Sequence, residues 1–274
     1  MSEEKSVVSE LVGQTSGVLE KAYDDLAHPT AKSVGNTVSL IPRTIGVWLG
    51  KWEKWVINGE ESIRLTAEAV REKAEKIPEE KLTEPEPYVA IPAVQQLSYC
   101  YDSEELREMY ANLLVSSMNM DKQDDVHPAY VDVIKQLTPD EAKLLRYIYR
   151  TQTKSIPIVD VIVHVSGVTN GVITLAKYYS NVYKSVLDNA ENYQVYVENL
   201  IRLNLCNIPG TYLLDTSLYD AIMSDTQLPQ KVFIDNLSKP IQTEDKSSTL
   251  RREVKKLSLD MTAFGKSFAA CCIE

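Results

Sequence analysis

The histidines are among the few residues of this chain that could carry out chemistry, and they are widely separated. They are His28, His127 and His164, and no HExxH motif brings two of them onto one helical face. His127 directly precedes Pro128, so we interpret it as a polar turn residue at the start of a helix. His164 lies in an apolar run and is expected to be a hydrogen-bonded core residue. A metal-binding or base role is the less favoured alternative for His127.

The four cysteines are Cys100, Cys206, Cys271 and Cys272. None of them forms a CxxC motif or a Cys/His spacing suited to zinc, and adjacent cysteines are poorly placed to pair with each other. We therefore expect reduced thiols inside the core.

Asp121, Asp124 and Asp125 form a carboxylate cluster that could in principle bind a hard cation. This run lacks the glycine and the terminal glutamate of a calcium loop, so it is interpreted as an acidic turn. The chain also lacks the P-loop, the dinucleotide-binding glycine fingerprint and the GxSxG motif. The sequence thus predicts a protein that is not an enzyme and that needs neither cofactor nor metal.

Composition narrows the class of partner. The chain has 274 residues, of which 44% are hydrophobic and 25% charged, as in an ordinary globular protein. Its net charge is −10, and acidic residues outnumber basic ones both in residues 1–87 and in residues 88–274. Because a duplex-DNA binder needs a basic field, nucleic acid is an unlikely partner. The N-terminus, MSEEKSVVSE, has no apolar signal core, which predicts a cytoplasmic protein.

The most apolar segment is 33–57, which holds the only tryptophans, Trp48, Trp52 and Trp55. Their spacing places them on one helical face. Charged residues and Pro42 interrupt the segment, so it is not a membrane span. Two interpretations stay open: the stripe docks on protein, including a second subunit, or it lies as an amphipathic helix on the inner face of the membrane.

The order of elements suggests four regions. Residues 1–76 are predicted to be an N-terminal helical region, ending in a charged helix over 59–76. Residues 77–87 contain three prolines and four glutamates and are predicted to be an acidic, extended linker. Residues 88–150 form a helical core, and residues 151–274 a C-terminal domain.

Helix signals are strongest in 88–150. Asp102 and Glu105 have the spacing of a capping box, and so do Thr138 and Glu141, with proline at the first helical position. Between them, apolar residues recur at helical spacing from Leu106 to Leu114 and indicate a broad buried stripe.

Polar and apolar residues recur in a fixed order along this region and near the C-terminus. They are Ile91, Pro92, Leu97, Ser98, Tyr99, Asp102, Leu106, Arg107, Tyr110, Asn112, Leu113, Leu114, His127, Pro128, Phe264 and Gly265. In these residues the chain resembles the abortive infection alpha (Abi-alpha) family of bacterial phage-defence proteins. The resemblance covers roughly residues 20–274 and is densest over 88–150. It implies a role in phage defence but identifies no catalytic residues, and we expect the matching residues to be structural.

The C-terminal half has a looser resemblance to a winged helix. Its first helix would follow Thr138, its first strand would be 155–165, its third helix 196–208, and a final strand and helix would complete it after residue 254. Asn199 and Arg202 could meet base edges, but the neighbouring leucines are typical of a core. The expected fold is therefore mainly α, with an N-terminal helical region, a helical domain and a winged-helix-like α+β portion.

These observations lead to one function hypothesis and two alternatives. The hypothesis is a non-enzymatic, cytoplasmic phage-defence protein acting through protein–protein contacts or self-association. The first alternative is a membrane-surface effector that inserts segment 33–57. The second is a winged-helix DNA-binding regulator, which the charge disfavours.

Overall fold

The protein is described from a computed structural model, which covers residues 60–97, 100, 103–165, 171–225, 241–243, 246–248 and 250–273. Segment 33–57, with Trp48, Trp52 and Trp55, lies outside the described residues, so the two interpretations of the tryptophan stripe stay predictions. Ser98, Tyr99 and Asp102 also lie outside them.

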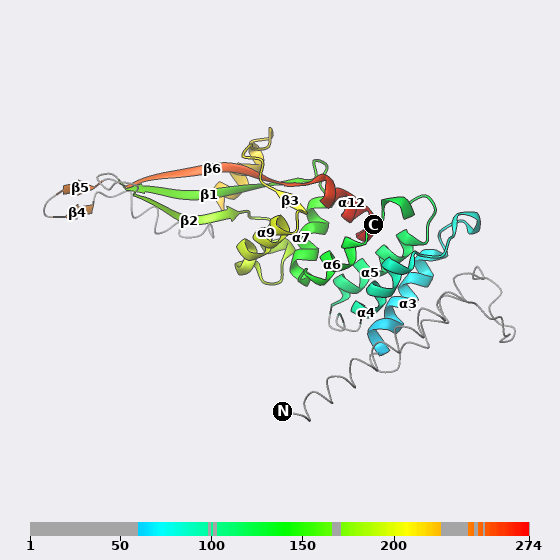
Figure 1. Ribbon diagram of the computed structural model, residues 1–274. Helices are drawn as coiled ribbons and strands as arrows, with labels where there is room; N and C mark the ends of the chain where they lie inside the picture. Colours follow the sequence, from blue (N-terminus) through cyan, green and yellow to red (C-terminus); the bar gives the residue numbers. More distant parts are fainter. Residues whose placement is uncertain are drawn as a thin grey trace, which may run out of the picture.

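A helical body forms one end of the molecule, and a long antiparallel sheet extends away from it (Figure 1). The central helix α5 contacts α3, α4, α6, α7 and α12. The predicted stripe on α5 is confirmed, because its apolar residues from Met109 to Leu114 are fully buried. The helices of the body are α3 (Glu60–Ala74), α4 (Pro87–Leu97), α5 (Glu104–Ser117), α6 (Ala129–Lys135), α7 (Pro139–Arg150) and α12 (Ala263–Cys272).

Helix caps set where these helices begin. Thr138 and Glu141 form the predicted capping box, with Pro139 at the first helical position of α7. The predicted cap of α5 is wrong by one residue. The hydroxyl of Ser103 accepts from the backbone N–H of Leu106 at 3.2 Å, so Ser103 is the cap and α5 begins at Glu104.

The sheet has four strands in the order β2-β1-β6-β3, all antiparallel. Pairing between β1 and β6 runs without a break from Ser155↔Asp260 to Val165↔Leu250. The described strands are β1 (Ser155–Val165), β2 (Val172–Tyr179), β3 (Cys206–Asn207) and β6 (Leu250–Met261), with a separate hairpin of β4 (Ile241–Thr243) and β5 (Lys246–Ser248).

The winged-helix prediction is wrong, although helices do dominate the described residues from 60 to 150. Strand β1 has the predicted bounds 155–165, but it is followed by a second long strand, β2, instead of a helix. The predicted helix 196–208 is α9 (Tyr193–Arg202), which ends before Asn204, whose φ of +57° is left-handed. The long β2-β1-β6 ladder overturns the prediction, because the wing of a winged helix is a short hairpin.

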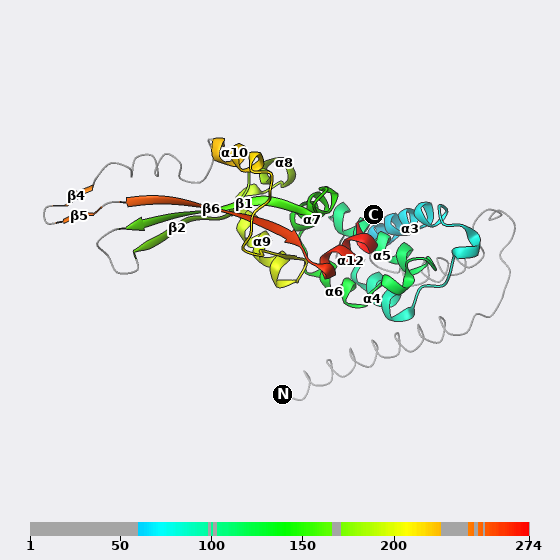
Figure 2. The same cartoon turned by 90° about the horizontal axis from the view of Figure 1, so that it is seen from above.

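We call β1, β2 and β6 together the β-arm. Figure 2 shows it running from the body toward β4 and β5. Two further helices, α8 (Tyr183–Val186) and α10 (Ser217–Ser224), complete its base. On one face Val159, Val161, Ala176, Tyr219 and Ile222 form a small core of their own.

The inner end of the β-arm belongs to the main core. Ile156 and Ile158 of β1 and Leu257 and Leu259 of β6 are buried in the same cluster as the body helices. The predicted linker 77–87 packs against the helical body, because the N–H of Thr83 donates to the carbonyl of Met118 at 2.9 Å. The predicted boundaries between the four regions stay predictions.

Candidate interaction surface

Most of the described residues that carry the family resemblance are packed inside the helical body. Their exposures fall into three groups. Leu97, Tyr110, Asn112, Leu113, Leu114 and Gly265 are buried; Ile91, Pro92, Leu106, Arg107 and Phe264 are partly buried; His127 and Pro128 are exposed.

The contact between α5 and α12 brings several of these residues together. The Asn112 amide donates to the carbonyl of Cys272 at 3.1 Å and accepts from the Lys73 ammonium at 2.8 Å. The hydroxyl of Ser116 donates to the carbonyl of Cys271 at 2.9 Å. Because the last carbonyls of a helix lack intrahelical donors, α5 satisfies the end of α12. These polar residues therefore have a structural role here.

Gly265 permits a second close approach of α12. A Cβ atom built on it would lie 2.0 Å from the carbonyl oxygen of Leu205. Only glycine fits at this distance, since the atom it would meet belongs to the backbone. The Gly265 position thus fixes α12 against the turn that follows α9.

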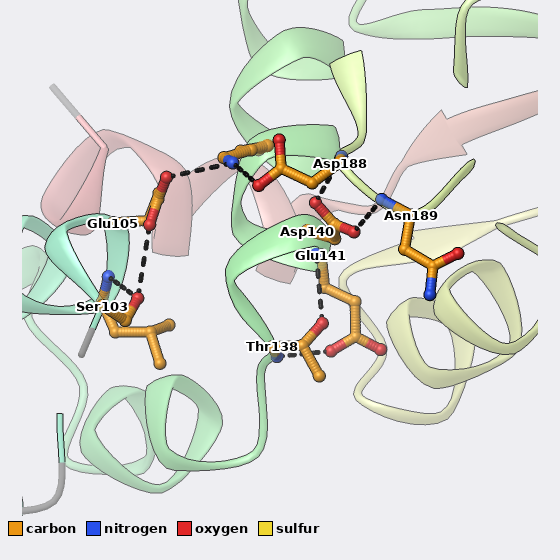
Figure 3. A network of polar contacts seen from close by, with 9 residues as sticks. Ser103, Glu105, Thr138, Asp140, Glu141, Asp188 and Asn189 are labelled. Carbon is orange, nitrogen blue, oxygen red and sulfur yellow. Dashed lines mark hydrogen bonds and ion pairs between the residues drawn. The ribbon is translucent and has the colours of Figure 1, made fainter. Parts of the chain in front are cut away.

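A polar network joins the starts of α5 and α7 to the segment after α8 (Figure 3). Lys143 contacts Glu105 at 3.3 Å and Asp188 at 2.6 Å. Both carboxylate oxygens of Asp140 accept backbone N–H groups, from Asp188 and Asn189, at 2.9 Å each. This cluster contains four carboxylates, and each of them has a partner in the fold.

The network also sets the ionisation of Glu105. Burial acts to raise the pKa of Glu105, but the hydrogen bonds from its own backbone N–H and from Lys143 outweigh burial and lower it. The pKa of Lys143 is raised, mainly by its hydrogen bond to Asp188. The charged forms of both groups are therefore favoured in the folded protein.

The histidines fulfil separate roles. His127 is a turn residue as predicted, since its Nδ1 accepts from the N–H of Ala129 at 3.1 Å. His164 is hydrogen-bonded, to Glu253 at 2.8 Å, but the prediction that it lies in the core is wrong. It sits on the outer half of β1, where its side chain is 39% exposed.

The cysteines are buried and unpaired, as predicted. Burial raises the pKa of Cys206 to about 12 and that of Cys271 to about 11. Thiolates are therefore disfavoured at these positions. Across the described ranges, no three His, Cys, Asp or Glu side chains gather closely enough to hold a metal ion.

The two residues of α9 considered for contact with base edges, Asn199 and Arg202, make hydrogen bonds within the fold instead. The Arg202 guanidinium donates to the side-chain oxygen of Asn199 at 2.7 Å and to that of Gln136 at 3.1 Å. The Asn199 amide donates to the backbone carbonyl of Gln136 at 3.0 Å. Both side chains thus link α9 to the turn between α6 and α7.

Two neighbouring exposed apolar residues lie on the β-arm. Val172 and Ile173, the first residues of β2, are 54% and 51% exposed. Thr174, which follows them, is also exposed. Sequence reasoning missed these residues, although a β-branched run directly after Gly171 is a strand signal.

A cluster of tyrosines fixes the base of the β-arm. The ring of Tyr193 on α9 stacks on Tyr183 at 4.9 Å and meets Tyr179 of β2 edge-on at 5.7 Å. The hydroxyl of Tyr183 donates to the carbonyl of Tyr178, whose φ is +61°. These contacts hold the inner half of β2, next to the body, in place. The outer half of β2 then lies at the edge of the sheet.

The abortive infection alpha family matches residues 58–272, which is most of the chain. The protein therefore belongs to this family, as its resemblance predicted. The comparison with curated proteins and the comparison with solved structures each gave no match. In the described part of the chain, no helix combines the length and the apolar character needed to cross a bilayer.

Proposed function

We propose that the protein serves abortive infection without catalysing a reaction, through a protein–protein contact made by the β-arm. One observation carries the proposal: β2 begins with apolar residues, Val172 and Ile173, that are half exposed on a projecting edge of the sheet. Uncovered apolar edge strands pair readily with other strands.

Two features of the body support the non-catalytic part of the proposal. The carboxylates of Figure 3 hold helix starts and a loop in place, and the buried thiols are kept protonated by desolvation. The alternative of reading DNA is less well supported, because Asn199 and Arg202 bind each other and Gln136.

Phage challenge tests the proposal. Cells would carry the wild-type gene, the Ile173→Lys variant, the Val195→Lys variant or no gene, and the efficiency of plaquing would be measured over a panel of phages. Val195 is the matched control, because it is 63% exposed and apolar but lies on α9. We expect Ile173→Lys to lose protection and Val195→Lys to keep it, at equal protein levels.

Two results would contradict the proposal. Equal lysis with and without the wild-type gene across the panel would remove the role in defence. Full protection by Ile173→Lys would remove the β-arm as the surface that acts.

A further inference from the structure

The two free edges of the sheet differ in how they are protected. Beyond the two residues paired with β3, the outer edge of β6 carries the exposed charges Arg251, Glu253 and Lys255. Charged side chains on an edge strand discourage pairing with another chain. The outer edge of β2 has no charged residue from Gly171 to Ala176. Among the described strands, β2 also ends the sheet.

The register shows which backbone groups β2 leaves outward. The N–H of Val165 donates to the carbonyl of Gly171 at 2.7 Å, and His164 lies opposite Val172. In an antiparallel pair, residues alternate between pointing both groups at the partner strand and pointing both away. Val172 and Thr174 therefore turn their N–H and C=O groups away from β1. Ile173, between them, is bonded to Val163.

The stretch of β2 whose outward backbone groups can pair regularly, which we call the window, is short. Register shifts between Val159 and Val161 and between Val161 and Ile162 interrupt the ladder opposite residues 174–179 of β2. Such bulges end regular pairing on an edge. Regular outward pairing is thus confined to the window, residues 171–174. A strand that pairs here must fit closely against a few β-branched residues.

We propose that this window pairs with the same window of a second copy of the chain. The two strands run antiparallel, and the two-fold axis passes between the two Ile173 residues. The proposal rests on the proposed function of the β-arm. Val172 and Thr174 of one copy exchange hydrogen bonds with Thr174 and Val172 of the other. The two Ile173 side chains then face each other in a non-hydrogen-bonded pair, with Cα atoms about 4.5 Å apart.

The window is self-complementary in shape. Valine and threonine are both β-branched and similar in size, so the two symmetry-related Val172–Thr174 pairs fit equally well. A two-fold contact also closes on itself, so the paired window cannot add a third copy. Both apolar side chains that are half exposed at this edge would be covered.

Charge does not oppose the contact, although the whole chain is acidic. Two ionisable side chains close to the window are paired within each copy: Lys177 with Glu198 at 3.8 Å, and His164 with Glu253 at 2.8 Å. Because residues 171–176 carry no charged side chain, no like charges face each other within the paired strands. Because the paired region is smaller than a standard interface of about 1,600 Å², we expect a dimer that dissociates in the micromolar range.

Cysteine cross-linking tests the register. Ile173→Cys places two thiols opposite each other, within disulfide reach. Val172→Cys is the matched control on the same strand, because its two thiols would be more than about 7 Å apart. Val195→Cys is the control for random collision. The four native cysteines are buried and give little background.

We expect Ile173→Cys to form a disulfide-linked dimer at least about tenfold faster than either control under mild oxidation, because pairing raises the effective concentration of the two thiols. Equal rates for all three variants would overturn the proposal. So would a faster rate for Val172→Cys, because that result requires a different register.

Thr174→Pro tests the hydrogen bonds in the full-length protein. The lost N–H points outward, so the β1–β2 ladder inside each copy is kept. We expect the dissociation constant from sedimentation equilibrium to rise roughly tenfold or more, because each copy loses one donor. A wild-type protein that stays monomeric at all concentrations, or a dimer unaffected by Thr174→Pro, would overturn the proposal.

The two proposals fail separately. If Ile173→Lys abolishes defence while the wild type is monomeric, the β-arm acts on another protein and only the second copy is excluded. If the cross-link forms but Ile173→Lys still protects, self-pairing stands and the functional role of the β-arm falls.

Discussion

Asn112 uses both ends of its amide, although it lies on the buried face of α5. It donates to Cys272 and accepts from Lys73, so removing it leaves a buried carbonyl and an ammonium without this partner. We expect Asn112→Ala to lower the free energy of unfolding by about 1–3 kcal/mol, the usual effect of leaving buried polar groups unsatisfied. Urea unfolding followed by circular dichroism would measure this.

Ser117→Ala is the matched control on the same helix. Its hydroxyl donates to the carbonyl of Leu114, which already accepts the backbone N–H of Met118. The loss should therefore be smaller, below about 1 kcal/mol. If the two variants are destabilised equally, the end of α12 does not depend on Asn112.

Glu105 gives the body an acid-sensitive contact. Since its folded-state pKa is lowered, its contribution to stability is fully present above the unfolded carboxyl pKa of about 4.3 and is lost as pH falls through the lowered value. We expect the free energy of unfolding to fall with pH below that point. Glu105→Gln should flatten this part of the curve, measured by urea unfolding at a series of pH values.

Glu104→Gln controls for the removal of a charge, because Glu104 is exposed on the same helical turn. If both variants change the acid slope alike, the effect belongs to net charge and not to the Glu105–Lys143 contact.

The approach of α12 to the turn after α9 depends on Gly265. A Cβ at this position would meet the Leu205 carbonyl at 2.0 Å, and neither backbone can move without disturbing a helix or strand. We expect Gly265→Ala to lower the free energy of unfolding by about 3 kcal/mol, at the upper end of overpacking effects. The melting temperature would fall with it.

Gly210→Ala separates this clash from backbone strain. Gly210 has a φ of +79°, but nothing lies within 4 Å of its built Cβ. Its variant should lose only the roughly 1–2 kcal/mol that a left-handed residue costs. A Gly265→Ala protein no less stable than Gly210→Ala would show that α12 can shift.

Elements with local signals could be predicted from the sequence. The run from Ser155 to Val165 is dominated by isoleucine and valine, and Thr138-Pro139 with Glu141 carries a complete cap, so both were predicted correctly. Asp102 and Ser103 are both good cap residues, and the sequence does not distinguish them. The predicted start of α5 therefore differs from the actual one by one residue.

The pairing of elements far apart in the chain could not be predicted. Strand β6 pairs with β1 from Val165↔Leu250 to Ser155↔Asp260, 85 to 105 residues apart in the chain, and takes the side of β1 opposite to β2, so β2 lies at the edge of the sheet. Exposure of Val172 and Ile173 is a consequence of that topology, whereas their sequence alone is equally compatible with a buried strand. The candidate surface was missed for this reason.

At the scale of the whole molecule, one core connects the body to the β-arm. Ile158 of β1 and Leu257 of β6 are buried in the same cluster as Leu113 of α5 and Phe268 of α12. Contacts that are continuous in this way favour opening of both parts together. The buried thiols can report on this, since Cys206 lies in the sheet and Cys271 in the body.

We expect the four native thiols to react with a disulfide reagent slowly and in a single kinetic phase, because each must wait for the shared core to open. Urea should accelerate all of them in parallel. The Ile173→Cys variant supplies the contrast: its added thiol should react in a separate fast phase, since position 173 is half exposed. If Cys206 instead reacts ahead of Cys271, identified by mass spectrometry, the sheet opens without the body. In that case the shared cluster contributes too little to couple the sheet to the body.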